Sequence, residues 1–346
     1  MAAFSAPSVV LRPFIGQLVD SWSRRGVHLL GTACLGLITL LYLVPHLATV
    51  LVARVIHGTG WAAFNTGGGT TVAELAPASR RGEAAGIYNL MPGLANMAMP
   101  TLGLLLLKAG GFGAPLVAAA LLGGTAALVL KLGPFLPDRS PSPRRGMRSW
   151  DAILERSAIL PMGLDTLFTL TTTLFWVYPP LFARAHGIPL TDLATYYLLL
   201  GVALVTARLV VGRLIDRVAR STALLAGAAV TSVALGVASV ADTALVLALA
   251  GVFHSFGSAL ITPAAMAVAI DGSSADRRGA AIATWSLGYQ VGIGVGAVLW
   301  GTVIDRLGFP APYLLALVSQ ALLIGLVVWR RDDLGAAIHG RQPPAA

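Results

Sequence analysis

The sequence contains little charge and a single cysteine. Only 11% of its 346 residues are charged, whereas ordinary soluble domains carry roughly 25%. Because 56% of the residues are hydrophobic, a soluble globule of this length could not hide its apolar surface, so lipid must solvate much of the chain. The one cysteine, Cys34, excludes an internal disulfide framework.

The sequence also lacks the motifs of enzymes and metal sites. There is no H-E-x-x-H, no G-x-S-x-G, no pair of carboxylates in a polar domain and no Cys/His cluster with metal-ligand spacing. We therefore expect no enzyme, no metal and no cofactor. The net charge of +9 could suggest a nucleic-acid partner. However, the basic residues are scattered through short loops without interleaved aromatics, so we expect no such partner.

Ten apolar runs are long enough to cross a bilayer, which needs about 20 residues. They are residues 27–45, 48–73, 84–107, 113–136, 158–182, 193–212, 221–240, 243–270, 280–304 and 311–329. A shorter run, 2–19, is interrupted by Pro7, Arg12 and Pro13. The runs predict an all-α polytopic membrane protein.

The basic residues predict the orientation of these spans. Eighteen arginines fall in one set of loops, and only Lys108, Arg184 and Arg306 fall in the alternate loops. Because positively charged loops remain on the cytoplasmic side, we expect segment 137–157 and the C-terminus in the cytoplasm, and the protein in the plasma (inner) membrane.

Three short motifs recur in the second half of the chain. The pairs are R-x-x-x-G-x-L-x-D at 12–20 and 208–216, R-R-G at 80–82 and 277–279, and H-x-x-G at 57–60 and 254–257. The offset is 196 for the first pair and 197 for the others, which indicates two pseudo-repeated helix bundles. The predicted domains are an N-terminal bundle (1–136, helices 2–6), a cytoplasmic linker (137–157), a C-terminal bundle (158–330, helices 7–12) and a cytoplasmic tail (331–346).

The same comparison predicts that the first bundle is incomplete. About 54 residues of the second bundle precede Gly212, whereas only 15 precede Gly16. The difference corresponds to helix 1 and part of helix 2. Either the start codon is assigned too late or the protein is truncated at its N-terminus.

The segment G-Q-L-V-D-S-W-S-R-R at 16–25 resembles the loop between helices 2 and 3 of major facilitator superfamily transporters, and R-V-I-H-G-T-G at 54–60 resembles their helix-4 motif. Pro100 and Gly103 resemble part of the helix-5 motif of the drug and metabolite efflux branch, which consists of proton antiporters. The resemblance implies two helix bundles around a central cavity that opens alternately to each side. It also implies a conformational motif, whose matching residues here are Gly16, Asp20, Arg24, Arg25, Gly212, Asp216 and Arg217.

Asp165 is the strongest candidate for a proton-carrying group. It shares a helical stripe with Thr169, Thr172 and Trp176. The neutral form of a carboxyl group is favoured away from water, so a carboxylate inside a span can take up and release protons. The alternative is that Asp165, within two turns of the cytoplasmic end, is simply solvated there.

Arg54 is the strongest candidate for a charged residue in the first bundle. Arg54, His57, Trp61 and Asn65 follow helical spacing on one face, which favours a transport cavity; snorkelling of Arg54 to the interface is the alternative.

The repeat maps Arg208 onto Arg12, so we interpret Arg208 as a snorkelling residue. The remaining cavity candidates, for which packing or interhelical hydrogen bonds are the alternatives, are His254, Asn89, Asn96 and Gln290.

The patterns together predict a secondary active transporter. We expect proton-coupled efflux of a small organic molecule or drug by alternating access. The alternatives are uptake of a metabolite by symport, or a truncated remnant that does not transport. The expected partners are a small-molecule substrate, protons and the lipid bilayer, and we expect a monomer.

Overall fold

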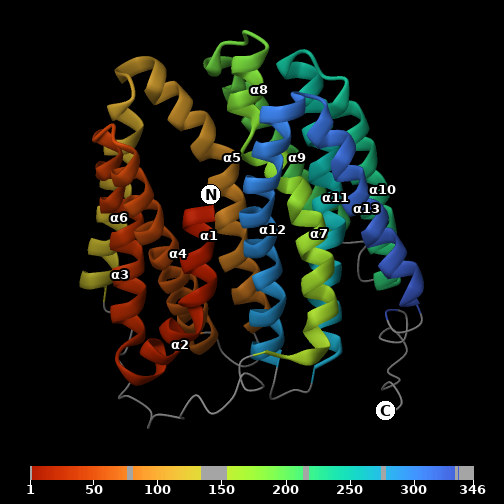
Figure 1. Ribbon diagram of the computed structural model, residues 1–346. Helices are drawn as coiled ribbons and strands as arrows, with labels where there is room; N and C mark the ends of the chain where they lie inside the picture. Colours follow the sequence, from red (N-terminus) through yellow and green to blue (C-terminus); the bar gives the residue numbers. More distant parts are fainter. Residues whose placement is uncertain are drawn as a thin grey trace. The chain divides into compact units, whose positions relative to one another are not determined.

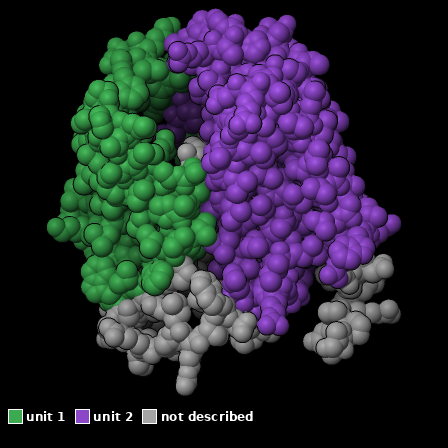
Figure 2. Space-filling view, in the orientation of Figure 1, with its two compact units in different colours: residues 1–95, 102–147 green, residues 96–101, 148–346 purple. Residues whose placement is uncertain are grey.

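The structure is a computed structural model in which residues 2–75, 81–133, 154–212, 218–273, 278–331 and 334 are described. Within these ranges all regular secondary structure is helical, and nine helices are long and apolar enough to cross a bilayer. The predicted all-α polytopic fold is confirmed. The chain divides into two compact units, coloured in Figure 2: unit 1 comprises residues 1–95 and 102–147, and unit 2 comprises residues 96–101 and 148–346.

Unit 1 is built around α3 and α4. Its elements are α1 (Ala2–Val10), α2 (Arg12–Ser21), α3 (Arg24–Leu37), η1 (Ile38–Leu43), α4 (Leu47–Leu75), most of α5 (Arg81–Gly110) and α6 (Gly113–Leu132). Helix α3 packs between α4 and α6, and α1 packs on α4, as Figure 1 shows.

Unit 2 contains the second set of spans. Its elements are η4 (Arg156–Ala158), α7 (Ile159–Trp176), α8 (Pro179–Ala185), η5 (Leu190–Asp192), α9 (Leu193–Gly212), α10 (Arg220–Ser239), α11 (Ala244–Asp271), α12 (Arg278–Leu307) and α13 (Ala311–Trp329). Helix α7 packs on α12, α11 packs on α9 and α10, and α13 packs on α10 and α7.

Two predicted spans are less regular than the sequence suggested. The prediction of one helix over 158–182 is wrong, because α7 ends at Trp176 and α8 begins at Pro179. Proline has no N–H to continue the helical ladder. The carbonyl oxygen of Phe175 instead accepts a hydrogen bond from the hydroxyl of Tyr196 on α9, at 2.7 Å.

The other irregular span is 27–45. Its α-helix ends at Leu37 and continues as the 3-10 helix η1. At this junction the hydroxyl of Thr39 donates to the carbonyl oxygen of Gly36. A side chain that bonds the preceding turn in this way competes with the α-helical ladder.

The sequence repeat is visible in the packing of each unit. In unit 1, a Cβ atom on Gly31 of α3 would lie 2.8 Å from the carbonyl oxygen of Gly60 of α4. In unit 2, a Cβ atom on Gly227 of α10 would lie 3.1 Å from the carbonyl oxygen of Gly257 of α11. These positions are related by offsets of 196 and 197. The two helix pairs therefore cross through equivalent glycines.

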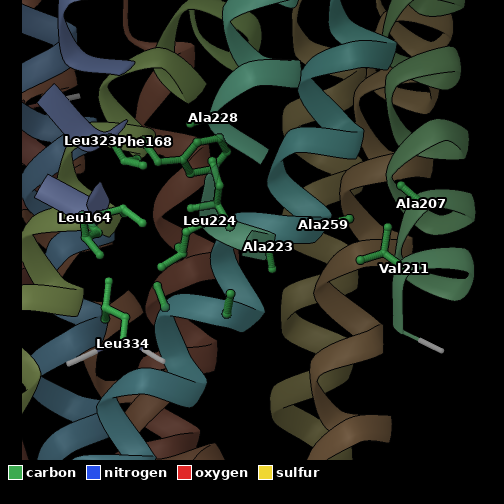
Figure 3. Close-up of a cluster of buried hydrophobic side chains, with 14 residues drawn as sticks. Leu164, Phe168, Ala207, Val211, Ala223, Leu224, Ala228, Ala259, Leu323 and Leu334 are labelled. Carbon is green, nitrogen blue, oxygen red and sulfur yellow. The ribbon is translucent and has the colours of Figure 1, made fainter. Parts of the chain in front are cut away.

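The core of unit 2 is assembled largely from small residues. Figure 3 shows a buried cluster in which Leu164 and Phe168 of α7 meet Leu224 of α10 and Leu323 of α13. Six of the fourteen buried members are alanines. Lipid is as apolar as a protein core, so helices in a bilayer associate mainly through close packing, which small residues permit. Large apolar side chains such as Val240, 76% exposed, point outward.

Candidate functional site

A buried carboxylate lies within a membrane span of unit 2. Asp165 belongs to α7, in the span Arg156–Trp176, and only 1% of its surface is exposed. Its Oδ2 atom is buried and has no hydrogen-bond partner among the described residues. Such burial does not fit the alternative of a solvated carboxylate. A buried charge without a partner is energetically costly, and ionisable residues inside a span mark candidate functional sites.

A tyrosine of another helix interacts electrostatically with this carboxylate and with an arginine of a third helix. Tyr289 of α12 interacts with both Asp165 and Arg208 of α9, and 46% of its surface is exposed. A carboxylate, a phenol and a guanidinium from α7, α12 and α9 are thus gathered in one region of unit 2. The interpretation of Arg208 as a snorkelling residue missed this grouping, because no local pattern connects α9 with α12.

Thr169 and Trp176, two other residues of the Asp165 stripe, contact neighbouring helices. The hydroxyl of Thr169 donates to the carbonyl oxygen of Asp165 at 2.7 Å. A Cβ atom on Gly292 of α12 would lie 2.7 Å from the Cβ atom of Thr169, so Thr169 faces α12. Trp176 lies 6.2 Å from the ring of Tyr197 on α9. The stripe therefore touches two different helices.

Two further predicted residues of unit 2 are buried in its helices. Gln290, which follows Tyr289 on α12, is 4% exposed. Thr172 is also buried, and its hydroxyl has no hydrogen-bond partner among the described residues.

His254 lies between two phenylalanine rings of α7. Its imidazole stacks on Phe168 at 5.2 Å and 9°, and on Phe175 at 4.5 Å and 15°. Only 1% of His254 is exposed, and neither ring nitrogen has a hydrogen-bond partner among the described residues. The two phenylalanine rings of α7 therefore stack on the imidazole of His254.

In unit 1, Arg54 and His57 meet through a tyrosine. The hydroxyl of Tyr42 in η1 lies 3.0 Å from Nδ1 of His57. The guanidinium carbon of Arg54 lies 5.4 Å from the centroid of the Tyr42 ring, within the range of a cation–π interaction. His57 is only 7% exposed. Sequence reasoning found Arg54 and His57 but missed Tyr42, whose partner depends on how η1 meets α4.

The other two residues of this α4 face are engaged locally. The ring of Trp61 lies 6.3 Å from the ring of Phe4 on α1. The side-chain amide of Asn65 donates to the carbonyl oxygen of Trp61, at 2.9 Å. Trp61 therefore packs toward α1, whereas Arg54 and His57 meet η1.

Arg25 of the predicted conformational motif binds the end of another helix. Its guanidinium donates to the carbonyl oxygens of Leu130 at 3.1 Å, Lys131 at 2.5 Å and Gly133 at 3.2 Å. The last carbonyls of an α-helix have no partner within the helix. Arg25 therefore caps the C-terminus of α6 from the N-terminus of α3, more than one hundred residues away in sequence.

Several predicted residues cannot be placed in the site. Asp216 and Arg217 belong to segment 213–217, outside the described residues. For a second group the helix backbone is placed but the side chains are not described, and this group comprises Gly16, Asp20, Arg24, Asn89, Asn96 and Gly212. Within the described part of the chain, no group of three or more His, Cys, Asp or Glu residues could hold a metal ion.

The arrangement of spans and the paired bundles can be compared with known proteins. The model of the Major Facilitator Superfamily matches residues 1–218 and 166–343. The chain belongs to this superfamily. It is therefore an integral membrane protein and a transporter, whose partners are a small-molecule substrate and the surrounding lipid.

Two similar proteins agree with this assignment. An uncharacterized MFS-type transporter of Methanocaldococcus jannaschii is 21% identical over 339 residues, which cover 96% of this chain and 87% of that protein. The crystal structure of a D-xylose–proton symporter superposes with a TM-score of 0.77 at 12% identity, covering 99% of this chain and 88% of the symporter. At this identity the superposition shows the fold alone, and it confirms the predicted major facilitator fold of this transporter.

Proposed function

We propose that this transporter is driven by protons, and that Asp165 is the group that carries them. The observation behind the proposal is the burial of its carboxyl group inside a span, 1% exposed and with Oδ2 unpartnered among the described residues. Removal from water disfavours a charged carboxylate relative to its neutral acid. Uptake of a proton at this oxygen therefore removes the energetic cost of a buried charge.

The neighbours of Asp165 provide a way to couple the proton to a conformational change. Tyr289 of α12 interacts electrostatically with Asp165 and with Arg208 of α9, so the charge on Asp165 acts on a residue of another helix that in turn interacts with α9. When Asp165 is protonated, its electrostatic interaction with Tyr289 is lost. The two protonation states thus favour different arrangements of α7, α9 and α12, which is the differential interaction that a two-state transporter requires.

The cargo that we propose is a small organic molecule, exported in exchange for protons by alternating access of the two bundles. Asp20 and Asp216 of the conformational motif would stabilise one of the two conformations. The distribution of arginines supports a chain whose C-terminus is cytoplasmic, in the plasma membrane. We propose a monomer, since each chain carries both bundles.

Uptake by symport is the second candidate direction. It is favoured by the structural likeness to a protein described as a D-xylose–proton symporter. Vesicles of known orientation separate the two directions, once a thermal-shift screen has identified a transported ligand. Accumulation of that ligand only in right-side-out vesicles would reject export.

The test of proton coupling compares Asp165→Asn with Asp242→Asn in proteoliposomes under an imposed pH gradient. Asparagine keeps the shape of the protonated acid but cannot ionise. We expect Asp165→Asn to remove the pH dependence of transport. Asp242 is an exposed carboxylate in the loop after α10, so its variant should keep the wild-type profile. An unchanged pH profile in Asp165→Asn would remove this residue from the mechanism.

A further inference from the structure

Trp285 carries a buried hydrogen-bond donor. It lies on α12, inside the span Ala281–Leu307, and is half-buried. Its Nε1 atom is buried and has no hydrogen-bond partner among the described residues. The indole N–H group can donate but cannot accept, and a buried donor that is left unsatisfied destabilises a fold. Trp285 therefore needs an acceptor nearby.

Another tryptophan of α12 has such an acceptor. Nε1 of Trp300 donates to the carbonyl oxygen of Leu170 on α7, at 2.8 Å. The neighbouring helix α7 thus satisfies the indole of Trp300. The residues of α7 that lie near Trp285 are the first place to look for its partner.

The contacts between α7 and α12 fix how the two helices align. A Cβ atom on Gly288 of α12 would lie 3.2 Å from Oγ1 of Thr166, and one on Gly296 would lie 2.7 Å from Oγ1 of Thr173. The hydroxyl of Thr166 also donates to the carbonyl oxygen of Gly288, at 3.3 Å. Residue numbers increase together on both sides of the contact, so the helices run in the same direction.

This alignment places Asp165 about one turn from Trp285. Asp165 precedes Thr166 on α7 and therefore lies at the level of Gly288. Trp285 is three residues before Gly288, on the turn of α12 that precedes the one facing Asp165. One turn of an α-helix corresponds to about 5.4 Å along its axis.

The packing of the indole agrees with this position. Trp285 packs on three buried alanines of η4, α11 and α12, which are Ala158, Ala269 and Ala281. It also packs on the larger cluster of Figure 3, to which Leu164 belongs. Leu164 is the residue before Asp165, so the indole and the carboxyl group lie in the same part of unit 2.

The two side chains have complementary unpartnered atoms. Oδ2 of Asp165 is buried without a partner among the described residues, as is Nε1 of Trp285, so the two atoms do not bond each other directly. An ionised carboxylate only accepts hydrogen bonds. A water molecule could accept from the indole and donate to the carboxylate. Two such bonds in series, each about 2.8 Å long, span about 5.6 Å, which matches one helical turn.

We infer that an ordered water molecule joins Nε1 of Trp285 to Oδ2 of Asp165, and that Trp285 is a positioning residue for this carboxylate. Buried waters typically bind polar groups that would otherwise be unsatisfied. The inference rests on the proposed function, because it names the residue that holds the proposed proton carrier in place. The bridge links Asp165 to α12 at a position four residues before Tyr289, which also interacts with Asp165.

The test is infrared difference spectroscopy of the purified full chain in detergent, between acidic and alkaline buffer. The C=O stretch of protonated Asp165 is assigned by its loss in Asp165→Asn. Ordered water is assigned by the shift of its O–H stretch in water labelled with heavy oxygen. In the wild type we expect one ordered-water band, and a C=O stretch lowered by the hydrogen bond from that water.

Trp285→Phe removes the N–H group and keeps an aromatic ring. We expect this variant to lose the water band and to show the C=O stretch of Asp165 at higher frequency. Trp285→3-benzothienylalanine, which replaces the N–H group by sulfur and keeps the shape of the indole, should have the same effect. It replaces the phenylalanine variant should that one not fold.

Trp300→Phe is the matched control. It removes an indole N–H group from the same helix, together with the bond to Leu170, without touching Asp165. We expect both bands to stay at their wild-type positions. A merely structural effect of removing a tryptophan would change the spectra of Trp300→Phe and Trp285→Phe alike.

The outcomes separate this inference from the proposed function. An unchanged C=O stretch and an unchanged water band in both Trp285 variants overturn the bridge, as does the lack of any ordered-water band in the wild type. A carboxyl group of Asp165 that does not respond to pH would instead count against proton coupling. The water band, compared between wild type and Trp285→Phe, still decides whether the bridge exists.

Discussion

The carbonyl oxygen of Gly60 lies 2.8 Å from the position that a Cβ atom would take on Gly31, so α3 and α4 touch through their backbones. That same Cβ atom would lie 2.4 Å from the backbone nitrogen of Phe64. Backbone atoms cannot rotate away as a flexible side chain can. The crossing of α3 and α4 therefore depends on glycine at this position.

Gly31→Ala should force α3 and α4 apart. We expect a destabilisation of about 1–3 kcal/mol, the usual range for overpacking a well-packed site, seen as a lower midpoint of thermal unfolding in detergent. Gly325→Ala is the control, because a Cβ atom on Gly325 of α13 would meet nothing within 4 Å. That variant should be neutral or slightly more stable. Equal midpoints for wild type and Gly31→Ala would contradict the close crossing.

Arg25→Ala should loosen the junction of α3 and α6. The variant removes three hydrogen bonds at the end of α6, two of them partly buried and one exposed, and a typical hydrogen bond contributes about 0.5–1.5 kcal/mol to stability. We expect a clear loss of thermal stability, and a smaller loss for Arg25→Lys, which can reach fewer carbonyls. Arg306→Ala, at an exposed position near the end of α12, should leave the midpoint unchanged. If Arg25→Ala unfolds at the wild-type temperature, the cap is not stabilising.

His254→Phe tests whether the stacked imidazole is a packing element. Phenylalanine can occupy the place between Phe168 and Phe175 without burying two unsatisfied nitrogens, so we expect unchanged or increased stability and retained transport. His254→Ala should instead lose about 3–5 kcal/mol, as for removal of a large buried aromatic ring. Loss of transport in a stably folded His254→Phe variant would show that the ring nitrogens take part in function.

Asp20→Asn tests the conformational motif. By resemblance, the motif aspartate stabilises one conformation of the transport cycle, so we expect slower transport with little change in the thermal midpoint. The readout is the initial rate of transport in proteoliposomes beside the unfolding temperature of the same preparation. Wild-type rates in Asp20→Asn would count against this role, and a large loss of stability would instead indicate a structural one.

Composition and periodicity predicted most of the fold. Every one of the ten predicted runs contains a helix, because about 20 consecutive apolar residues have few alternatives to a helix in lipid. The repeat offset identified in the sequence also reappears as equivalent glycine contacts at Gly31 and Gly227. The incorrect predictions concerned local features. One is the break after Trp176, where a pair of prolines ends the helix and the hydroxyl of Tyr196 donates a hydrogen bond to the carbonyl oxygen of Phe175.

The sequence by itself determined that the chain crosses a membrane, that its two halves are related, and which few ionisable residues lie inside spans. These properties follow from local hydrophobicity and from spacing along one helix. Only the tertiary structure decided the partners: Arg25 with the end of α6, Tyr42 with His57 and Arg54, and Tyr289 with Asp165 and Arg208. Such contacts join helices far apart in the chain, and they depend on how side chains pack across helix crossings, which no local pattern encodes.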